Sequence, residues 1–285
     1  MAKTEFSRAE PQERIPGPAD DLAAEMLSER LRNGHALQQS PRRVYALLRS
    51  AIRSGELPAH SRLEEADLVG ELKTSRNAVR LALRQLGADG LVERRPGVGT
   101  VVVSQIHSFP VFECVGPAIG VTGALLLIEN QRIPPTPYLS SRLGGGTEPL
   151  HMSEFLVRVG GQTVGIFSRY GHQRAEALEQ DRPLLSPGDL SWYRRIHGSA
   201  PGDISVVIEA TTVDSRTARL LGLAEGSPLL VRETLYRDQT HAPVELHITY
   251  LDSRKASLMA VVTDGELQHD VISSSLPTPV PIAPI

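Results

Sequence analysis

Four side chains between residues 76 and 84 have the chemistry needed to read the bases of duplex DNA. They are Arg76, Asn77, Arg80 and Arg84. On a helix of 3.6 residues per turn they share one face, and apolar residues occupy the other. Arg can donate two hydrogen bonds to guanine, and Asn can pair with adenine in the same way. No Asp or Glu stands four residues away to pair with them, so this face favours DNA reading over simple solvation.

The residues on either side of this helix could contact the DNA backbone. Ser75 is a good N-cap, and the free amides at the helix start suit a phosphate. Downstream, a glycine-rich hairpin carries Arg94, Arg95, Gly97 and Gly99. The two glycines would make the turn, while the flanking arginines could approach the backbone or the minor groove. We expect the hairpin to serve both purposes.

A second set of polar side chains lies on a strand expected over 244–251. Alternation along the strand places Glu245, His247 and Thr249 on one face and Leu246, Ile248 and Tyr250 on the other. This pattern fits one solvent-exposed face and one buried face. A further alternative is a metal-dependent sensor or enzyme that uses His241, Glu245 and His247. The sequence offers neither an HExxH motif nor a second histidine cluster to support it.

The DNA-reading residues must be positioned by a helix-turn-helix, and the hydrophobic pattern predicts one. Apolar residues at helical spacing follow Pro41 and stop at Gly55, a second helix is expected over 64–72, and a third begins at Ser75. The segment LVERRPGVGTVVV then predicts a hairpin. Three helices followed by a hairpin form a winged helix, which we assign to residues 41–103.

Length and charge support a division into two parts. With 285 residues, the chain is long enough for two domains. The formal net charge is −3, yet residues 41–103 hold eleven Arg or Lys against seven Asp or Glu. The basic excess is therefore confined to the expected DNA-binding domain. The overall negative charge argues against a structural DNA-bridging protein.

Composition argues against several other classes. A single Cys removes disulfide scaffolds and Cys-based zinc modules, and no apolar run approaches the ~18 residues of a membrane span. No nucleophile-elbow motif is present. We therefore expect a cytoplasmic protein without membrane contact, cofactor, metal or enzymatic activity.

The remainder of the chain predicts a largely antiparallel α+β domain over 112–265, after a linker at 104–111. Its helical stretches are expected at 174–180, 190–196 and 215–221. Residues 1–40 are expected to be mostly disordered apart from a short helix ending at Leu31. The Pro-rich residues 266–285 predict an unfolded tail.

The winged-helix segment carries a specific family resemblance. It reads SGELPAHSRLEEADLVGELKTSRNAVRLALRQLGADGLVERRPGVGTVV and resembles the DNA-binding domain of GntR-type bacterial transcription regulators. The resemblance implies that Arg76 and Arg80 contact bases and that Ser75 and Asn77 contact the backbone or bases. It also marks Gly97 as the wing contact. Lys73 stands where that family usually has a turn glycine.

Two later segments resemble the UTRA domain of the HutC subfamily, whose fold is similar to chorismate lyase: an antiparallel sheet with helices around a ligand cavity. They are FLVRVGGQTVGIFSRY and EATTVDSRTARLLGLAEGSPLLVRETLYRDQTHAPVELHITYLD. The resemblance directs five effector-binding candidates toward that cavity: Ser168, Arg169, Glu209, Glu245 and His247. Arg169 favours an anionic effector.

A single winged helix offers few contacts, so we expect a homodimer that reads an inverted repeat in operator DNA. The order of a DNA-reading domain, a linker and a pocket domain predicts a repressor that a small-molecule effector releases from DNA. A chorismate-lyase-like enzyme is the remaining alternative. Fold alone does not carry function, and a DNA-binding module ahead of the pocket favours sensing over turnover.

Overall fold

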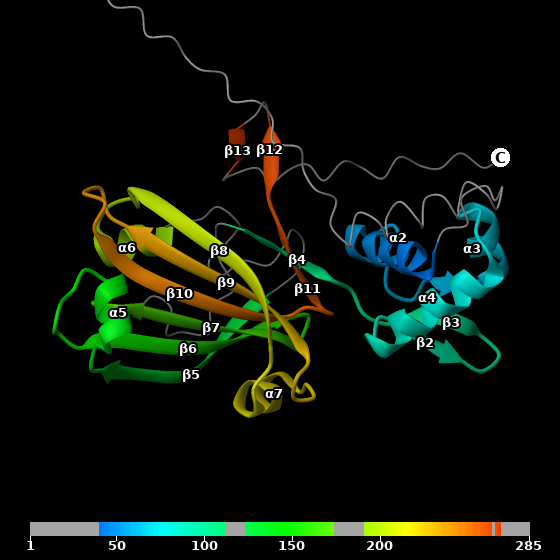
Figure 1. Ribbon diagram of the computed structural model, residues 1–285, viewed down its shortest axis with the longest axis horizontal. Coiled ribbons are helices and arrows are strands. Elements are labelled where there is room, and N and C mark those ends of the chain that lie inside the picture. The colour runs from blue at the N-terminus through cyan, green and yellow to red at the C-terminus, as the bar shows by residue number, and fades with distance from the viewer. Residues whose placement is uncertain (1–39, 112–122, 174–190, 264–265, 269–285) are drawn as a thin grey trace, which may run out of the picture.

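The computed structural model describes residues 40–111, 123–173, 191–263 and 266–268. The expected N-terminal extension with its helix, the helix over 174–180 and most of the Pro-rich tail lie outside the described residues. The described chain forms two regions (Figure 1). We call residues 40–106 the winged-helix region and residues 107–268 the sheet region.

The winged-helix region contains three helices and a small antiparallel sheet. Its elements are α2 (Pro41–Ser54), β1 (Arg62–Leu63), α3 (Glu65–Glu71), α4 (Arg76–Ala88), β2 (Val92–Arg95) and β3 (Gly99–Val102). Strand β3 lies between β1 and β2. The β2–β3 hairpin projects away from the helices as a wing (Figure 1). The expected winged helix is confirmed.

Local signals explain where these helices begin and end. The Ser40 side chain accepts a hydrogen bond from the first turn of α2, and Pro41 occupies the first helical position. Gly55 ends α2 in the left-handed conformation with a φ of 84°. Ser75 caps α4, because its side chain accepts a hydrogen bond from the backbone N–H of Ala78 at 3.2 Å.

The turn between α3 and α4 uses left-handed backbone at Lys73, with a φ of 46°. This is the position where the family resemblance places a glycine. A residue with a Cβ atom is strained in this conformation by about 1 kcal/mol. The helices on either side hold the turn in place, because Leu68 of α3 and Val79 of α4 share one buried core.

The sheet region is built on a six-stranded antiparallel sheet in the order β5-β6-β7-β10-β9-β8. Its strands are β5 (Gly123–Ile133), β6 (Leu150–Val159), β7 (Gln162–Gly171), β8 (Asp203–Thr212), β9 (Pro228–Arg237) and β10 (Pro243–Asp252). The α+β fold with an antiparallel sheet is thus confirmed. The edge strand β5 and the helix after it lie in a stretch for which the sequence predicted no element.

Short helices cover the two faces of this sheet. Helix α6 (Ser191–His197) lies on one face, where Trp192 shares a hydrophobic cluster with Phe167 of β7. Helices α5 (Pro137–Arg142) and α7 (Ser215–Leu221) lie on the opposite face, where Ala218 shares a cluster with Ile166. Neighbouring residues of a strand point to opposite faces, which explains this division. We call these faces the α6 face and the α7 face.

Two short strand pairs complete the fold. Strand β4 (His107–Pro110) pairs in parallel with β11 (Ala256–Met259), and β12 (Val261–Thr263) pairs with β13 (Glu266–Gln268). The stretch expected to be a plain linker therefore contains a strand, and the first residues of the expected tail form another. The β4–β11 pair joins the chain leaving the winged-helix region to the chain that follows β10.

Candidate nucleic-acid interface and ligand site

The side chains that could read DNA all lie exposed on α4. They are Arg76, Asn77, Arg80 and Arg84. On the opposite side of the helix, Val79 and Leu86 are 0% exposed and pack in the core. The structure therefore brings the predicted residues together on one accessible face, as helical periodicity predicted.

This face is less free of acids than the sequence suggested. The Nε of Arg80 lies 4.0 Å from an Oε atom of Glu65, which belongs to α3 and not to the same helix. Both side chains are well exposed, and an exposed contact at this distance contributes little energy. Within the described part of the chain, Arg76 and Arg84 form no ion pair.

The wing combines a glycine turn with exposed arginines. Gly97 and Gly99 have φ angles of 73° and 104°, so the turn itself requires glycine. Arg94 and Arg95 are exposed on β2, and the Nε of Arg95 lies 3.0 Å from Glu93. Contact of these residues with DNA stays a prediction.

The second site is a buried cluster of charged and aromatic side chains on the α6 face. The Nε of Arg169 donates to Glu245 at 2.9 Å, and its Nη2 donates to the other oxygen of the same carboxylate. His247 and His197 each contact this carboxylate through Nε2 at 2.6 Å. Arg169, Glu245 and His247 are 0% exposed. Alternation along β10 left open that Glu245 and His247 lie on a solvent-exposed face. In the structure this face is buried.

Electrostatics fix the charge states in this cluster. Burial alone would raise the pKa of Glu245, but the charge of Arg169 and the hydrogen bonds from both histidines outweigh it and hold the pKa far below its usual range. Burial lowers the pKa of His247. The carboxylate is therefore charged at neutral pH, and His247 is neutral.

Within the described residues, His247 and a neighbouring threonine each carry a buried polar atom without a hydrogen-bond partner. Because charged Glu245 can only accept, the Nε2 of His247 must donate, and its Nδ1 is left as an acceptor. This Nδ1 is buried without a hydrogen-bond partner among the described residues, and so is the Oγ1 of Thr234. Thr234 is the register partner of His247 on β9, so the two atoms lie on the same face. Buried polar atoms without partners are costly and mark a place where a ligand or water could bind.

The remaining effector candidates are not part of this cluster. Ser168 points to the α7 face, where its hydroxyl donates to Glu154 at 3.2 Å, and Glu154 also binds Arg216. Glu209 is exposed on the edge strand β8, and its register partner Val231 belongs to the α7 face. Ser168 and Arg169 are adjacent on one strand and cannot both line one cavity.

Sequence reasoning missed two contributors to the cluster, His197 and Trp192. Both come from α6, which was expected as a helix but given no functional role. The ring of Trp192 lies 5.3 Å from that of His247, and Tyr193 and Tyr236 pack around them. Burial raises the pKa of Tyr193 to about 12, so this phenol stays protonated. In the sequence, the segment WYRRIH places two aromatic residues before a histidine, and this pattern could have indicated that the helix contributes to the cluster.

The metal-ligand set His241, Glu245 and His247 is not formed. His241 lies in the turn before β10, its side chain is 76% exposed, and its Nδ1 contacts Asp203 at 2.7 Å. A register shift between Pro243 and Glu245 also removes the strand parity on which the set depended. In the described part of the chain, no group of three metal-ligating side chains is found.

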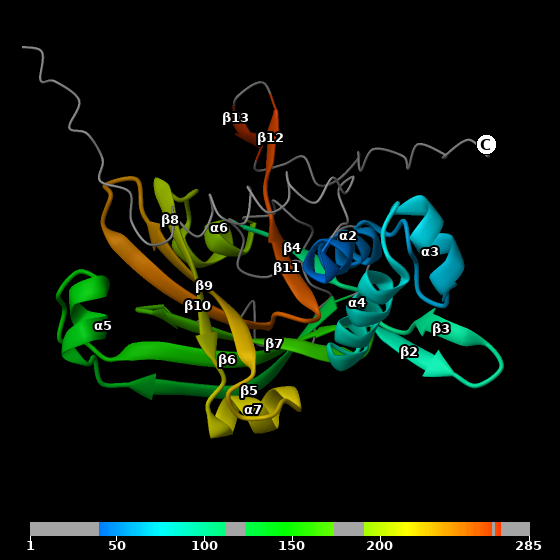
Figure 2. The ribbon, with the colours of Figure 1, turned by 45° about the vertical axis from the view of Figure 1, so that its right-hand side comes forward.

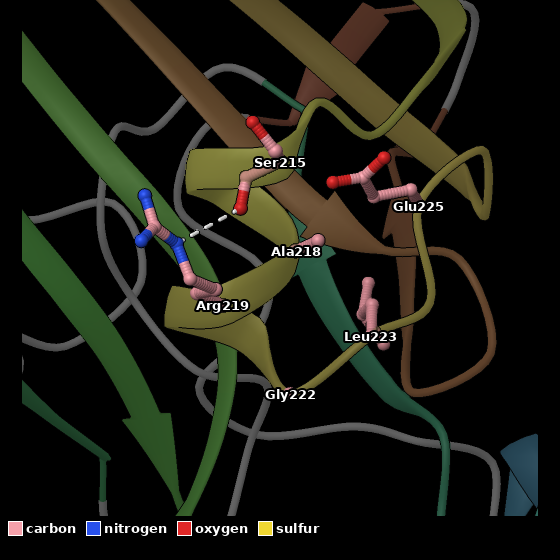
Figure 3. Close-up of a pocket in the computed structure, with 6 residues that line it drawn as sticks. All are labelled: Ser215, Ala218, Arg219, Gly222, Leu223 and Glu225. Carbon is pink, nitrogen blue, oxygen red and sulfur yellow. Dashed lines mark hydrogen bonds between the residues drawn. The ribbon is translucent and has the colours of Figure 1, made fainter.

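A separate hollow of about 580 Å³ lies beside α7 (Figure 3). It is lined by Ser215, Ala218, Arg219, Gly222, Leu223 and Glu225. The Nε of Arg219 donates back to the carbonyl of Ser215 at 3.3 Å. None of the predicted effector residues lines this hollow.

Among the helices of the described residues, none is long and apolar enough to cross a membrane.

Comparison with known proteins gives matches to both regions. The model for bacterial regulatory proteins of the gntR family matches residues 41–102, and the model for the UTRA domain matches residues 120–256. A histidine utilization repressor from Pseudomonas putida is 28% identical over 199 residues, which cover 66% of this chain and 78% of that protein. A protein of the same name from Pseudomonas aeruginosa is 42% identical over 72 residues, covering 25% of this chain and 29% of that one.

Among solved structures, PhnF from Mycobacterium smegmatis has a similar fold. Its TM-score is 0.52, its sequence is 22% identical, and the match covers 78% of this chain and 99% of that one.

Proposed function

Because the chain belongs to the gntR family of bacterial regulatory proteins and carries a UTRA domain, we propose that it is a DNA-binding transcriptional repressor that a small molecule releases from its operator. One observation carries this proposal. A winged helix with an exposed basic and amide face is joined to a second region whose buried charged cluster includes unsatisfied polar atoms.

DNA reading is proposed to use α4 in the major groove. An operator duplex is selected from a random library with the full chain. Arg80→Ala should weaken binding to this operator by about 1 to 3 kcal/mol, because a base contact is lost, and should weaken binding to random duplexes by less. Arg194→Ala is the matched control, since it removes another exposed arginine, from α6. Equal losses on operator and random DNA would reassign Arg80 to the phosphate backbone. No loss on either would remove it from the interface.

The effector is proposed to bind at the α6 face, beside His247 and Thr234. An acceptor at His247 Nδ1 calls for a ligand with an N–H or O–H donor. A carboxylate on the ligand would compete with Glu245 for Arg169, which is how an anionic effector could disturb the cluster.

A thermal-shift panel on the full chain tests this site. Given the names of the relatives, it begins with histidine and imidazole carboxylates, each paired with its amide to test the need for an anion. Thr234→Val should leave the free protein as stable or more stable, because it removes an unsatisfied buried hydroxyl, while weakening the ligand shift. Thr211→Val, at an exposed position on β8, is the control. An unchanged ligand shift in Thr234→Val would exclude this face as the site.

A homodimer is proposed to place two α4 helices on an inverted repeat. The edge strand β8 supports this proposal, because it exposes 55% of Val207 and 46% of Ile208, and among the described strands only β9 pairs with it. The other edge strand, β5, exposes Leu126 and Ile128 less. Light scattering and footprinting test the proposal, and a monomer protecting one half-site would reject it.

A further inference from the structure

We propose that Arg49 is the positioning residue that couples the effector site to the DNA-reading helix, an inference that rests on the function proposed above. Arg49 lies on α2, in the winged-helix region. Its Nη2 donates a hydrogen bond to the backbone carbonyl of Ser253, which lies 204 residues further along the chain, in the turn between β10 and β11. Both views show this turn beside the winged-helix region (Figures 1 and 2).

The same guanidinium group also reaches the end of α4. Its Nη1 lies 4.0 Å from an Oδ atom of Asp89, the residue that caps the C-terminus of α4. Asp89 accepts further hydrogen bonds from the Tyr45 hydroxyl at 2.6 Å and from Gln85 at 3.3 Å. Arg49 and Asp89 are 24% and 15% exposed, so their contact is partly shielded from solvent. One side chain therefore bridges the DNA-reading helix and the sheet region.

The turn contacted by Arg49 is firmly attached to the strand of the effector site. Strand β10 carries Glu245 and His247 and ends at Asp252, which is 1% exposed and binds Arg254 through both carboxylate oxygens. The Ser253 hydroxyl donates to the carbonyl of Pro228 at the start of β9 at 3.0 Å. A displacement of β10 therefore carries the carbonyl of Ser253 with it.

A second attachment lies at the chain that leaves the winged-helix region. The backbone N–H of His107 donates to the carbonyl of Lys255 at 2.7 Å, at the start of the parallel β4–β11 pair. This backbone pairing keeps the two regions adjacent, whereas the Arg49 contact is a single side-chain bond. A shift of about 1 Å breaks such a bond, because hydrogen bonds weaken steeply beyond normal donor–acceptor distances. The orientation of α4 relative to β10 can thus respond to a small change at the effector site.

The test uses the chain's single tryptophan, Trp192, which packs against His247 and reports on the effector site without an effector. An operator duplex is first selected from a random library with the wild-type full chain. Because coupling is reciprocal, we expect binding of this duplex to change Trp192 emission, and binding of a random duplex to change it less.

The Arg49→Lys variant keeps a positive charge near Asp89. Lysine has a single ammonium group, so it lacks the second nitrogen with which the guanidinium reaches the carbonyl of Ser253. In this variant we expect the operator-induced emission change to fall to the random-duplex level. Its operator Kd should stay within about fivefold of the wild-type value, the lower end of typical allosteric coupling. Arg53→Ala, one turn further along α2, is the matched control, because within the described residues this exposed arginine hydrogen-bonds only to Ser50 of its own helix. It should retain the full emission change.

Several outcomes would overturn the coupling role. These are an unchanged emission response in Arg49→Lys, no response in the wild type, or loss of operator binding in a folded Arg49→Lys protein. Asp89→Asn is the second variant. This variant removes the charge that Arg49 contacts at the end of α4, and it should also reduce the operator-induced change in Trp192 emission. A full emission change in Asp89→Asn would contradict the proposal as well. If the wild-type chain selects no sequence from the library, the proposed function fails, and that result is distinct from failure of the coupling.

Discussion

Replacing Glu245 by Gln should destabilise the sheet region by about 3 to 5 kcal/mol. The guanidinium of Arg169 is 0% exposed and is bonded to both oxygens of this carboxylate. Removing the negative charge leaves a buried cation without its counter-ion, which is the costly way to break a buried pair. Because domains are stable by only about 5 to 15 kcal/mol in total, this is a large fraction of the stability.

The hydrogen bonds explain why the amide cannot replace the carboxylate. Arg169, His197 and His247 all direct donors at the two oxygens of Glu245. Gln presents one oxygen and one NH2 group, so at least one donor must face another donor. The double variant Arg169→Met with Glu245→Gln should cost less than the two single variants added together, by about 0.5 to 3 kcal/mol, because it removes the stranded cation.

Urea unfolding of the full chain, followed by Trp192 fluorescence, measures these changes. Asp203→Asn is the control, because it removes an acid from solvent-exposed pairs with His241 and Arg237, and it should barely move the unfolding midpoint. A loss below about 1 kcal/mol in Glu245→Gln, or additive losses in the double variant, would refute the reasoning.

Three further outcomes are expected. Burial holds the pKa of His247 below its ordinary value of 6.5, so the folded state resists protonation and stability should fall as the pH drops below that value. The slope for one proton is at most about 1.4 kcal/mol per pH unit, and His247→Gln should flatten it in urea titrations between pH 7.5 and 5.5. Burial also lowers the pKa of His107, so this residue adds a pH dependence of stability with the same sign. The contribution of His247 is therefore the difference between the wild-type slope and the slope of the variant. Val207→Lys on the exposed edge of β8 should shift the protein toward monomers in light scattering, and unchanged dimers would exclude this edge. Deletion of residues 1–38, in which basic and acidic residues are mixed and prolines recur, should leave operator specificity intact in footprinting, and loss of specificity would contradict this prediction.

The winged-helix region could be predicted closely because its signals are local. The Ser75 cap, the Gly55 stop and the 3.6-residue stripe through Val79 depend on neighbours within a few residues. The acid near Arg80 could not be foreseen in this way, because Glu65 reaches it from another helix.

The proposed ligand site depends on contacts that are distant in sequence. Strand alternation correctly grouped Glu245 with His247, but it gave no hint that α6 covers them or that His197 completes the cluster. The grouping of Ser168 with Arg169 could have been avoided from the sequence alone, because adjacent strand residues face opposite sides.

Reciprocal titration tests the central claim most directly. Operator affinity of the full chain is measured without and with a saturating ligand found in the thermal-shift panel, and ligand affinity is measured without and with operator. The account predicts that the ligand weakens operator binding by about 5- to 150-fold, and that operator weakens ligand binding by the same factor. Unequal factors at equilibrium, no change in operator affinity, or conversion of the ligand into a product would contradict it.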